Sequence, residues 1–164
     1  MVIVGIDPGL ATMGYGVIRT EGSRLICLDY GCVYTKADED LPARLIQIFD
    51  GVSSLIAQYE PDAVSIEELF FNRNVKTALT VGYARGVALL AVAKTGCPLY
   101  EYTPIQVKQA VVGYGRAEKS QVQQMVKILL NMPDTPKPDD AADGLALAIT
   151  HAHSAHASNL FKVK

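Results

Sequence analysis

The sequence has no long hydrophobic run and no recognisable targeting segment. All of its apolar stretches fall short of the ~20 residues that a membrane-spanning helix requires, so we expect no membrane span. The first residues, MVIVGIDPG, lack a charged region and a cleavage site, and they predict a first strand rather than a signal peptide. We therefore expect a cytoplasmic protein.

Cysteine is also scarce, which argues against a disulfide framework. The three cysteines, Cys27, Cys32 and Cys97, form no C-x-x-C pair and no zinc-binding spacing. Their neighbours are mostly apolar, a setting typical of buried free thiols in a reducing compartment. This scarcity agrees with the predicted cytoplasmic location.

The signatures of several enzyme classes are missing as well. The chain contains no G-x-S-x-G, no Walker lysine motif and no H-E-x-x-H. His151, His153 and His156 lie close together near the C-terminus, and the spacing of the last two could suit a metal ion. We expect surface histidines there, since no other metal-binding signature accompanies them.

What the chain does contain predicts one globular α/β domain. Of its 164 residues, 49% are hydrophobic and 20% are charged, which is typical of a folded protein. No repeat, low-complexity segment or linker divides it, so we expect a single domain over residues 1–156 and a short tail over 157–164. Alternating and β-branched segments predict strands at 2–7, 13–19, 24–34, 63–68 and 98–102. Helical periodicity predicts helices at 41–56, 75–94, 104–112 and 116–130, and a last helix from about residue 139.

The order of these segments brings two acidic residues together. A helix between two strands usually makes a right-handed crossover, so the first and fourth strands should be parallel neighbours. Asp7 and Glu67 would then stand at the carboxyl ends of adjacent strands, where open α/β sheets bind ligands.

Two further acids lie on the last predicted helix. Asp140 and Asp143 are three residues apart and share one helix face, and an alanine- and leucine-rich face can dock this helix on the sheet. Four carboxylates would suit Mg²⁺ or Mn²⁺. Two such ions about 4 Å apart would support an in-line phosphoryl displacement.

Each acid also has an ordinary structural explanation. Asp139 and Asp140 would complement the positive end of a helix dipole, and Asp7 could begin a turn. Glu67 could be an exposed strand residue with Glu68 as an equally acidic neighbour. Asp143 is harder to explain in this way, and the four acids in one topology favour a site.

Charge is distributed unevenly along the chain, although the net charge is only -2. Residues 1–72 hold four Lys or Arg against eleven Asp or Glu, whereas residues 73–137 hold nine basic residues against three acidic ones. Such a basic stretch can bind phosphate if its side chains share a face. The alternative is a set of solvated helix faces.

Five sequence blocks in order carry a family resemblance. They are GIDPGLATMGYGVI, AVSIEELFFNRN, VGYARGVALLA, PIQVKQAVVGYGRAEKSQVQQMV and DDAADGLALAITHAH. Together they closely resemble the RuvC family of Holliday-junction resolvases, over about residues 2–153. The resemblance implies an RNase H-like fold with a mixed five-stranded sheet flanked by helices.

The resemblance also implies an activity and a site. It implies a homodimeric, magnesium-dependent endodeoxyribonuclease that nicks two like-polarity strands of a four-way junction and works with a branch-migration complex of the RuvA/RuvB type. The family's catalytic acids, which would bind two metal ions in each site, fall on Asp7, Glu67, Asp140 and Asp143. The residues expected to contact DNA are Phe70, Arg73, Lys108, Arg116 and Lys119.

Two alternatives remain open from the sequence. One is an RNase H-like module that binds nucleic acid or phosphate without cutting it, against which the complete acid set argues. The other is an RNase H-like nuclease acting on RNA or simple flaps, and only the resemblance argues against it. The segment Gly82–Gly86 would lie in the dimer interface or pack within its own chain.

Overall fold

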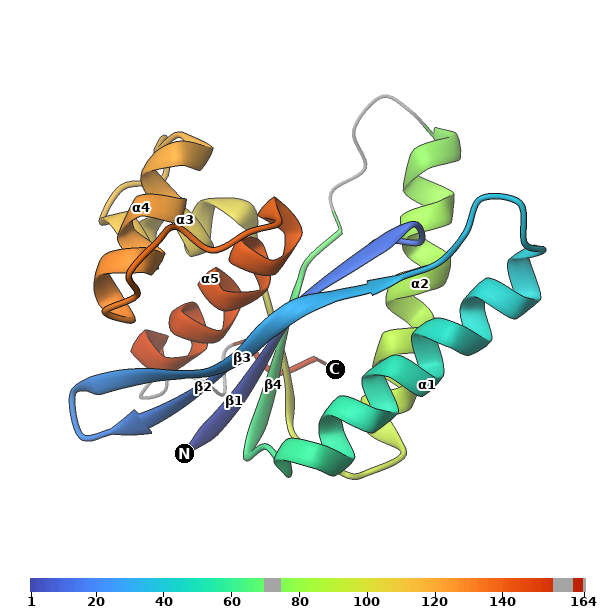
Figure 1. Cartoon of the computed structure of the whole chain (residues 1–164), viewed down its shortest axis with the longest axis horizontal. Helices are drawn as coiled ribbons and strands as arrows, with labels where there is room; N and C mark the ends of the chain where they lie inside the picture. The colour runs from blue at the N-terminus through green and yellow to red at the C-terminus, as the bar shows by residue number, and fades with distance from the viewer. Residues whose placement is uncertain (70–74, 155–160, 164) are drawn as a thin grey trace.

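The computed structural model describes residues 1–69, 75–154 and 161–163. Its centre is a five-stranded sheet in the order β3-β2-β1-β4-β5 (Figure 1). The strands are β1 (Val2–Asp7), β2 (Thr12–Glu21), β3 (Arg24–Tyr34), β4 (Ala63–Glu67) and β5 (Leu99–Tyr102). The first three form an antiparallel meander, and β4 and β5 run parallel to β1. The predicted parallel pairing of the first and fourth strands is therefore confirmed.

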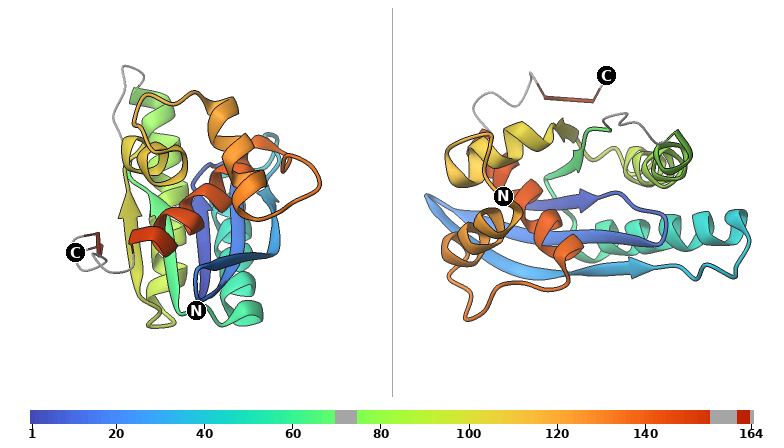
Figure 2. Two further views of the ribbon diagram at one scale, coloured as in Figure 1. Left: turned by 90° about the vertical axis from the view of Figure 1, so that its left-hand side faces the viewer. Right: turned by 90° about the horizontal axis from the view of Figure 1, so that it is seen from above.

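Helices cover both faces of the sheet (Figures 1 and 2). They are α1 (Leu41–Tyr59), α2 (Val75–Ala93), α3 (Pro104–Val112), α4 (Lys119–Leu129) and α5 (Asp139–Ser154). The first two pack on one face and the last three on the other. The fourth predicted helix began three residues too early, because the chain from Arg116 to Glu118 is not yet helical.

Strand alternation decides which side chains of β1 meet which layer. Val4 and Ile6 enter the core beneath α1 and α2, whereas Ile3 enters the core beneath α5. Asp7 follows the same alternation as Ile3 and so points to the α5 side of the sheet. The regular pleat thus directs this carboxylate toward the helix that carries Asp140 and Asp143.

Glycines let α5 lie directly against the sheet. A Cβ atom built on Gly144 would lie 2.6 Å from the backbone carbon of Tyr15, and one on Gly16 would lie 2.5 Å from the Cα of Leu145. A Cβ atom built on Gly5 would likewise clash with the carbonyl oxygen of Gly144. Any larger side chain at these positions would push α5 away, so the glycines set the height of the helix above β1 and β2.

The other end of α5 is fixed by a histidine that we expected at the surface. His151 is only 2% exposed, and its Nδ1 lies 2.8 Å from the hydroxyl of the fully buried Tyr102. Its ring also lies 4.3 Å from that of Tyr100. The surface prediction was wrong because β5 supplies aromatic partners for this helix face. His153 is exposed as expected, and His156 lies outside the described residues.

Residues beyond α5 return to the sheet edge. The amide of Glu101 donates to the carbonyl of Phe161, and the amide of Val163 donates to that of Leu99. The described part of the predicted tail, 161–163, therefore lies alongside β5.

The three cysteines are free thiols, but each is half-buried rather than buried. Among the described residues, no helix combines the length and apolarity needed to cross a membrane.

Candidate functional site

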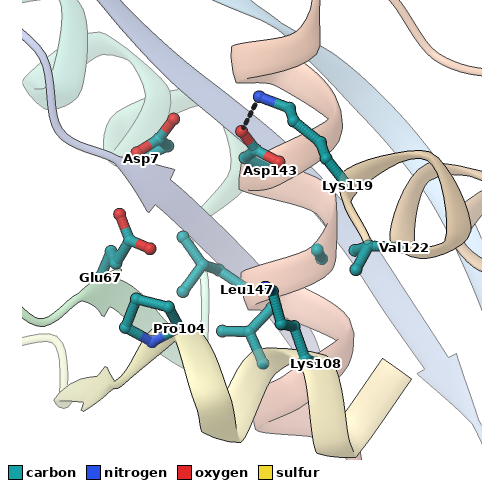
Figure 3. A pocket seen from close by; sticks show the side chains of 10 residues that line it. Asp7, Glu67, Pro104, Lys108, Lys119, Val122, Asp143 and Leu147 are labelled. Atoms are coloured by element: carbon teal, nitrogen blue, oxygen red, sulfur yellow. Dashed lines mark hydrogen bonds and ion pairs between the residues drawn. The ribbon is translucent and has the colours of Figure 1, made fainter. Parts of the chain in front are cut away.

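Asp7 and Glu67 meet at the carboxyl ends of two central strands. Ile6 of β1 pairs with Ile66 of β4, and the two acids directly follow this pair. Both line a cavity of about 260 Å³ that opens between the end of the sheet and helices α3, α4 and α5 (Figure 3). The prediction that these acids share one edge is confirmed by the register.

Asp143 lines the same cavity from α5, and its carboxylate points toward the two strand acids (Figure 3). Asp140 lies one turn earlier and lines an adjacent cavity with the loop that joins β1 and β2. It is still near enough for its charge to raise the pKa of Asp7 and of Asp143. The expected pair Asp140 and Asp143 therefore lines two different cavities.

Burial and mutual repulsion make Asp7 a weak acid. Its pKa is raised from 3.8 to about 8, first by burial and then by the charges of Glu67, Asp143 and Asp140. Among the described residues, only Lys119 opposes this rise. An aspartate in such surroundings holds a proton at neutral pH unless a cation compensates its charge.

The two other acids of the cavity are affected in the same direction. Burial raises the pKa of Glu67, and the charge of Asp143 adds to it, whereas Lys119 and a hydrogen bond with Asp7 act against the rise. Burial likewise raises the pKa of Asp143, although its contact with Lys119 acts against it. The cavity therefore concentrates negative charge that favours cations.

Lys119 is one of two lysines that line this cavity. It is the first residue of α4, whose start is fixed by a 2.8 Å hydrogen bond from the amide of Glu118 to Oε1 of Gln121. Its Nζ lies 2.9 Å from Oδ2 of Asp143 and 3.7 Å from Oδ2 of Asp139. Burial would lower its pKa, but these carboxylates raise it above its ordinary value.

Lys108 enters the cavity from α3. That helix begins at Pro104, after the N-cap residue Thr103, whose hydroxyl accepts a hydrogen bond from the amide of Gln106. Lys108 follows one turn after Pro104. The apolar part of the lining includes Val107, Val122 and Leu147. Two predicted DNA-contacting lysines thus border the acids on the side of α3 and α4 (Figure 3).

Sequence reasoning missed the role of Arg85. We counted it in the basic stretch, but its guanidinium lies 2.6 Å from Glu101 and its Nε donates to the main-chain carbonyl of Glu67. It is largely buried and joins α2 to the ends of β4 and β5. Its charge is used to hold the Glu67 backbone rather than presented at the surface, and no local pattern revealed this partner.

The remaining predicted positions are not among the described residues that line the cavity. Arg116 is exposed just before α4 and does not line it. Phe70 and Arg73 lie outside the described residues. Of the two extra acids, Asp139 is exposed beside Lys119, and Glu68 does not line the cavity either. Within the described chain, no three His, Cys, Asp or Glu side chains are already arranged around one metal position.

Comparison with known proteins places the chain among nucleases. A sequence model of the family described as crossover junction endodeoxyribonuclease RuvC matches residues 3–151. The crossover junction endodeoxyribonuclease RuvC of Alkaliphilus metalliredigens is 58% identical over 164 residues, covering 100% of both chains. That of Heliobacterium modesticaldum is 61% identical over 154 residues, covering 94% of this chain and 95% of the relative.

Solved structures agree with these sequence matches. Thermus thermophilus RuvC superimposes with a TM-score of 0.92 at 38% identity, over 99% of this chain and all of the other. The same protein in complex with a Holliday junction substrate gives a TM-score of 0.91 at 36% identity and the same coverage. The yeast mitochondrial resolvase Ydc2, at 19% identity and a TM-score of 0.63, shares the fold. The predicted RNase H-like architecture is thus confirmed.

Proposed function

Because the chain belongs to the RuvC family of crossover junction endodeoxyribonucleases, we propose that the cavity at the carboxyl ends of β1 and β4 is where it cuts DNA. The protein is a Holliday-junction resolvase, an endonuclease of recombination and repair. We propose that Asp7, Glu67, Asp140 and Asp143 are its catalytic acids. The observation that carries it is the meeting of Asp7, Glu67 and Asp143 in one cavity beside two lysines.

The acids suit a divalent metal ion. RuvC nucleases depend on such an ion, and we propose Mg²⁺, with Mn²⁺ as a substitute and two ions in each site. The donor groups are all carboxylate oxygens, which these hard cations prefer. The raised pKa of Asp7, caused first by burial and then by the neighbouring carboxylates, supports a cation there. Bound there, the metal would activate a water molecule and stabilise the leaving oxygen in an in-line displacement.

Lys119 and Lys108 would bind the phosphates of the cut strand. A cavity lined by acids alone would repel DNA, and cations at its border offset that repulsion. Since Lys119 already contacts Asp143, metal binding at Asp143 would release its ammonium group for a phosphate. The lysine would therefore neutralise the acids before substrate binding and contact DNA afterwards. Phe70, Arg73 and Arg116 remain proposed DNA contacts.

A homodimer would supply the second cut. Three large side chains on one face of α2 are exposed, with Leu79 at 53%, Tyr83 at 40% and Leu90 at 56%. Gly86 lies on the same face, and a Cβ built there would meet no atom within 4 Å. This apolar stripe supports pairing with a second copy through Gly82–Gly86, because a two-fold symmetric junction requires two sites.

We also propose a partner complex of the RuvA/RuvB type and a cytoplasmic location.

The test is cleavage of a labelled four-way junction beside a linear duplex of the same sequence, with and without magnesium. We expect paired nicks only in the junction, only with metal, and none with Asp143→Asn. Asp139→Asn is the matched control, because Asp139 is exposed on the same helix and should be dispensable. Loss with Asp139→Asn alone would contradict the assignment of the acids. Binding without cutting would favour a non-nuclease module, and equal cutting of the duplex would favour a less selective nuclease.

A further inference from the structure

A second cavity is lined by Asp140, one turn of α5 before Asp143, which lines the first. Its volume is about 420 Å³, and it lies between the β1–β2 loop, the start of α1 and the middle of α2. Its lining includes Gly9 and Leu10 from the loop, Arg44 from α1, Val81 from α2 and Asp140. Arg44 comes from the acidic first part of the sequence, residues 1–72, where we expected no basic residue to contact DNA.

The side chain of Arg44 is oriented by a buried hydroxyl. Its Nε donates to Oγ1 of Thr35 over 2.8 Å, and Thr35 is only 8% exposed. The Thr35 hydroxyl in turn donates to the carbonyl of Leu10 over 2.6 Å. The guanidinium is therefore fixed relative to the loop that directly follows Asp7.

The charge of Arg44 is not used within the described part of the protein. Among those residues its guanidinium hydrogen-bonds only through Nε, and no carboxylate lies within ion-pairing distance of it. This distinguishes it from Lys119 and Arg85, which are both paired with acids. With Nε occupied, the terminal N–H groups of the guanidinium remain available to bind an oxyanion such as a phosphate.

We propose that Arg44 binds a phosphodiester group of the cleaved DNA strand on the Asp140 side of the acids. Lys108 and Lys119 border the acids on the other side, so the strand would have a cationic contact on each flank of the cut. Arginine suits this role because its planar fork can bind phosphate through two hydrogen bonds. The inference rests on the proposed function of the acids, which it extends by one DNA-binding residue.

Equilibrium binding to a four-way junction in EDTA, measured over a range of salt concentrations, tests this contact without cleavage. We expect Arg44→Gln to weaken binding about tenfold and to lower the slope of log affinity against log salt by about one. Arg44→Lys should keep most of the slope because it keeps the charge. The matched control is Arg24→Gln, which removes the same charge from an exposed position at the start of β3.

Thr35→Val separates phosphate binding from a purely structural role. It removes the hydrogen bond to Arg44 but keeps the positive charge, so the salt slope should stay near that of the wild type. The proposal is wrong if Arg44→Gln matches Arg24→Gln in both affinity and slope. It is also wrong if Thr35→Val reproduces the full effect of Arg44→Gln with an equal loss of melting temperature.

Measuring the same variants on a linear duplex distinguishes the phosphate contact of Arg44 from the junction selectivity of the proposed function. A wild-type protein that binds duplex and junction equally would contradict junction selectivity. A lower salt slope for Arg44→Gln on both substrates would still support the phosphate contact. Loss of selectivity and loss of the contact are therefore read from different comparisons.

Discussion

The ammonium group of Lys119 lies 2.9 Å from a carboxylate oxygen of Asp143. The two residues come from different helices and are 24 positions apart in the sequence. This ion pair is partly solvent-exposed, with 52% of the lysine side chain and 33% of the aspartate side chain accessible, so its contribution to stability is small. Its importance lies in where it holds a positive charge beside the acids.

Replacing Lys119 by alanine should weaken junction binding and flatten its dependence on salt, because one phosphate contact is lost. The same change should strengthen binding of Mn²⁺ to the DNA-free protein, since Asp143 then has no competing cation. Titration calorimetry with Mn²⁺ and anisotropy with labelled junction measure the two effects. Lys127→Ala is the control, because Lys127 lies on the same helix but does not line the cavity. An unchanged salt slope would rule out the phosphate contact.

Asp7→Asn should abolish cleavage and leave junction binding intact. The substitution removes a charged oxygen ligand without adding bulk, so the fold and the lysines should be unaffected. Cleavage and binding assays on the same junction measure the two outcomes. Loss of binding together with loss of folded structure would instead show that Asp7 is structural.

The raised pKa of Asp7 predicts how stability depends on pH in metal-free buffer. The folded state holds this proton with a pKa of about 8 rather than 3.8, so it binds more protons than the unfolded state between these values. Stability is therefore favoured at low pH and declines as pH rises through this range. The buried His151 has a pKa lowered to about 4, so it makes stability rise with pH between about 4 and 6.5. Above about pH 6.5 it has no further effect on the pH dependence of stability.

The melting temperature should thus fall between about pH 6.5 and 8, and Asp7→Asn should reduce that fall. Asp50→Asn, at an exposed aspartate on α1, should keep the wild-type dependence. Scanning calorimetry in EDTA measures both. Equal slopes for wild type and Asp7→Asn would show that Asp7 is ionised in the folded protein throughout this range.

Gly144→Ala should displace α5 from the sheet. The added methyl group would meet the backbone of Tyr15 and Gly16, which cannot move aside cheaply, so we expect a loss of about 1–3 kcal/mol and slower cleavage. Gly86→Ala places the same group in open space within the protomer; compared in the Leu90→Glu background, so that the proposed dimer face does not contribute, it should be neutral or stabilising by up to about 1 kcal/mol. Denaturant unfolding at matched protein concentration compares them. Equal costs for both would mean that the close approach of α5 is not required.

Charge on the exposed stripe of α2 should separate the protomers. Leu79→Glu or Leu90→Glu should shift the protein toward monomer and reduce paired nicking, because a buried unpaired carboxylate disfavours association. Ile46→Glu is the control, since Ile46 is 60% exposed but lies on α1. Sedimentation measures the mass. If Ile46→Glu is the variant that dissociates, the interface lies on the α1 face.

Sequence alone determined the local elements and the candidate acids. Strand alternation, helical periodicity and the crossover rule predicted the parallel pairing of β1 and β4, and with it the meeting of Asp7 and Glu67. These features depend on residues close together in the chain or on general rules of connection. The family resemblance, rather than these rules, predicted that Lys108 and Lys119 lie near the acids, and both line the cavity.

Only the tertiary structure decided which partner each polar side chain meets. Arg85 binds the backbone end of β4, His151 is buried against Tyr102, and Arg44 borders a cavity that reaches Asp140. Each of these contacts joins elements far apart in the sequence, so no local pattern encodes it. The height of α5 above the sheet is likewise a tertiary property, because it depends on glycines from both surfaces meeting backbone to backbone.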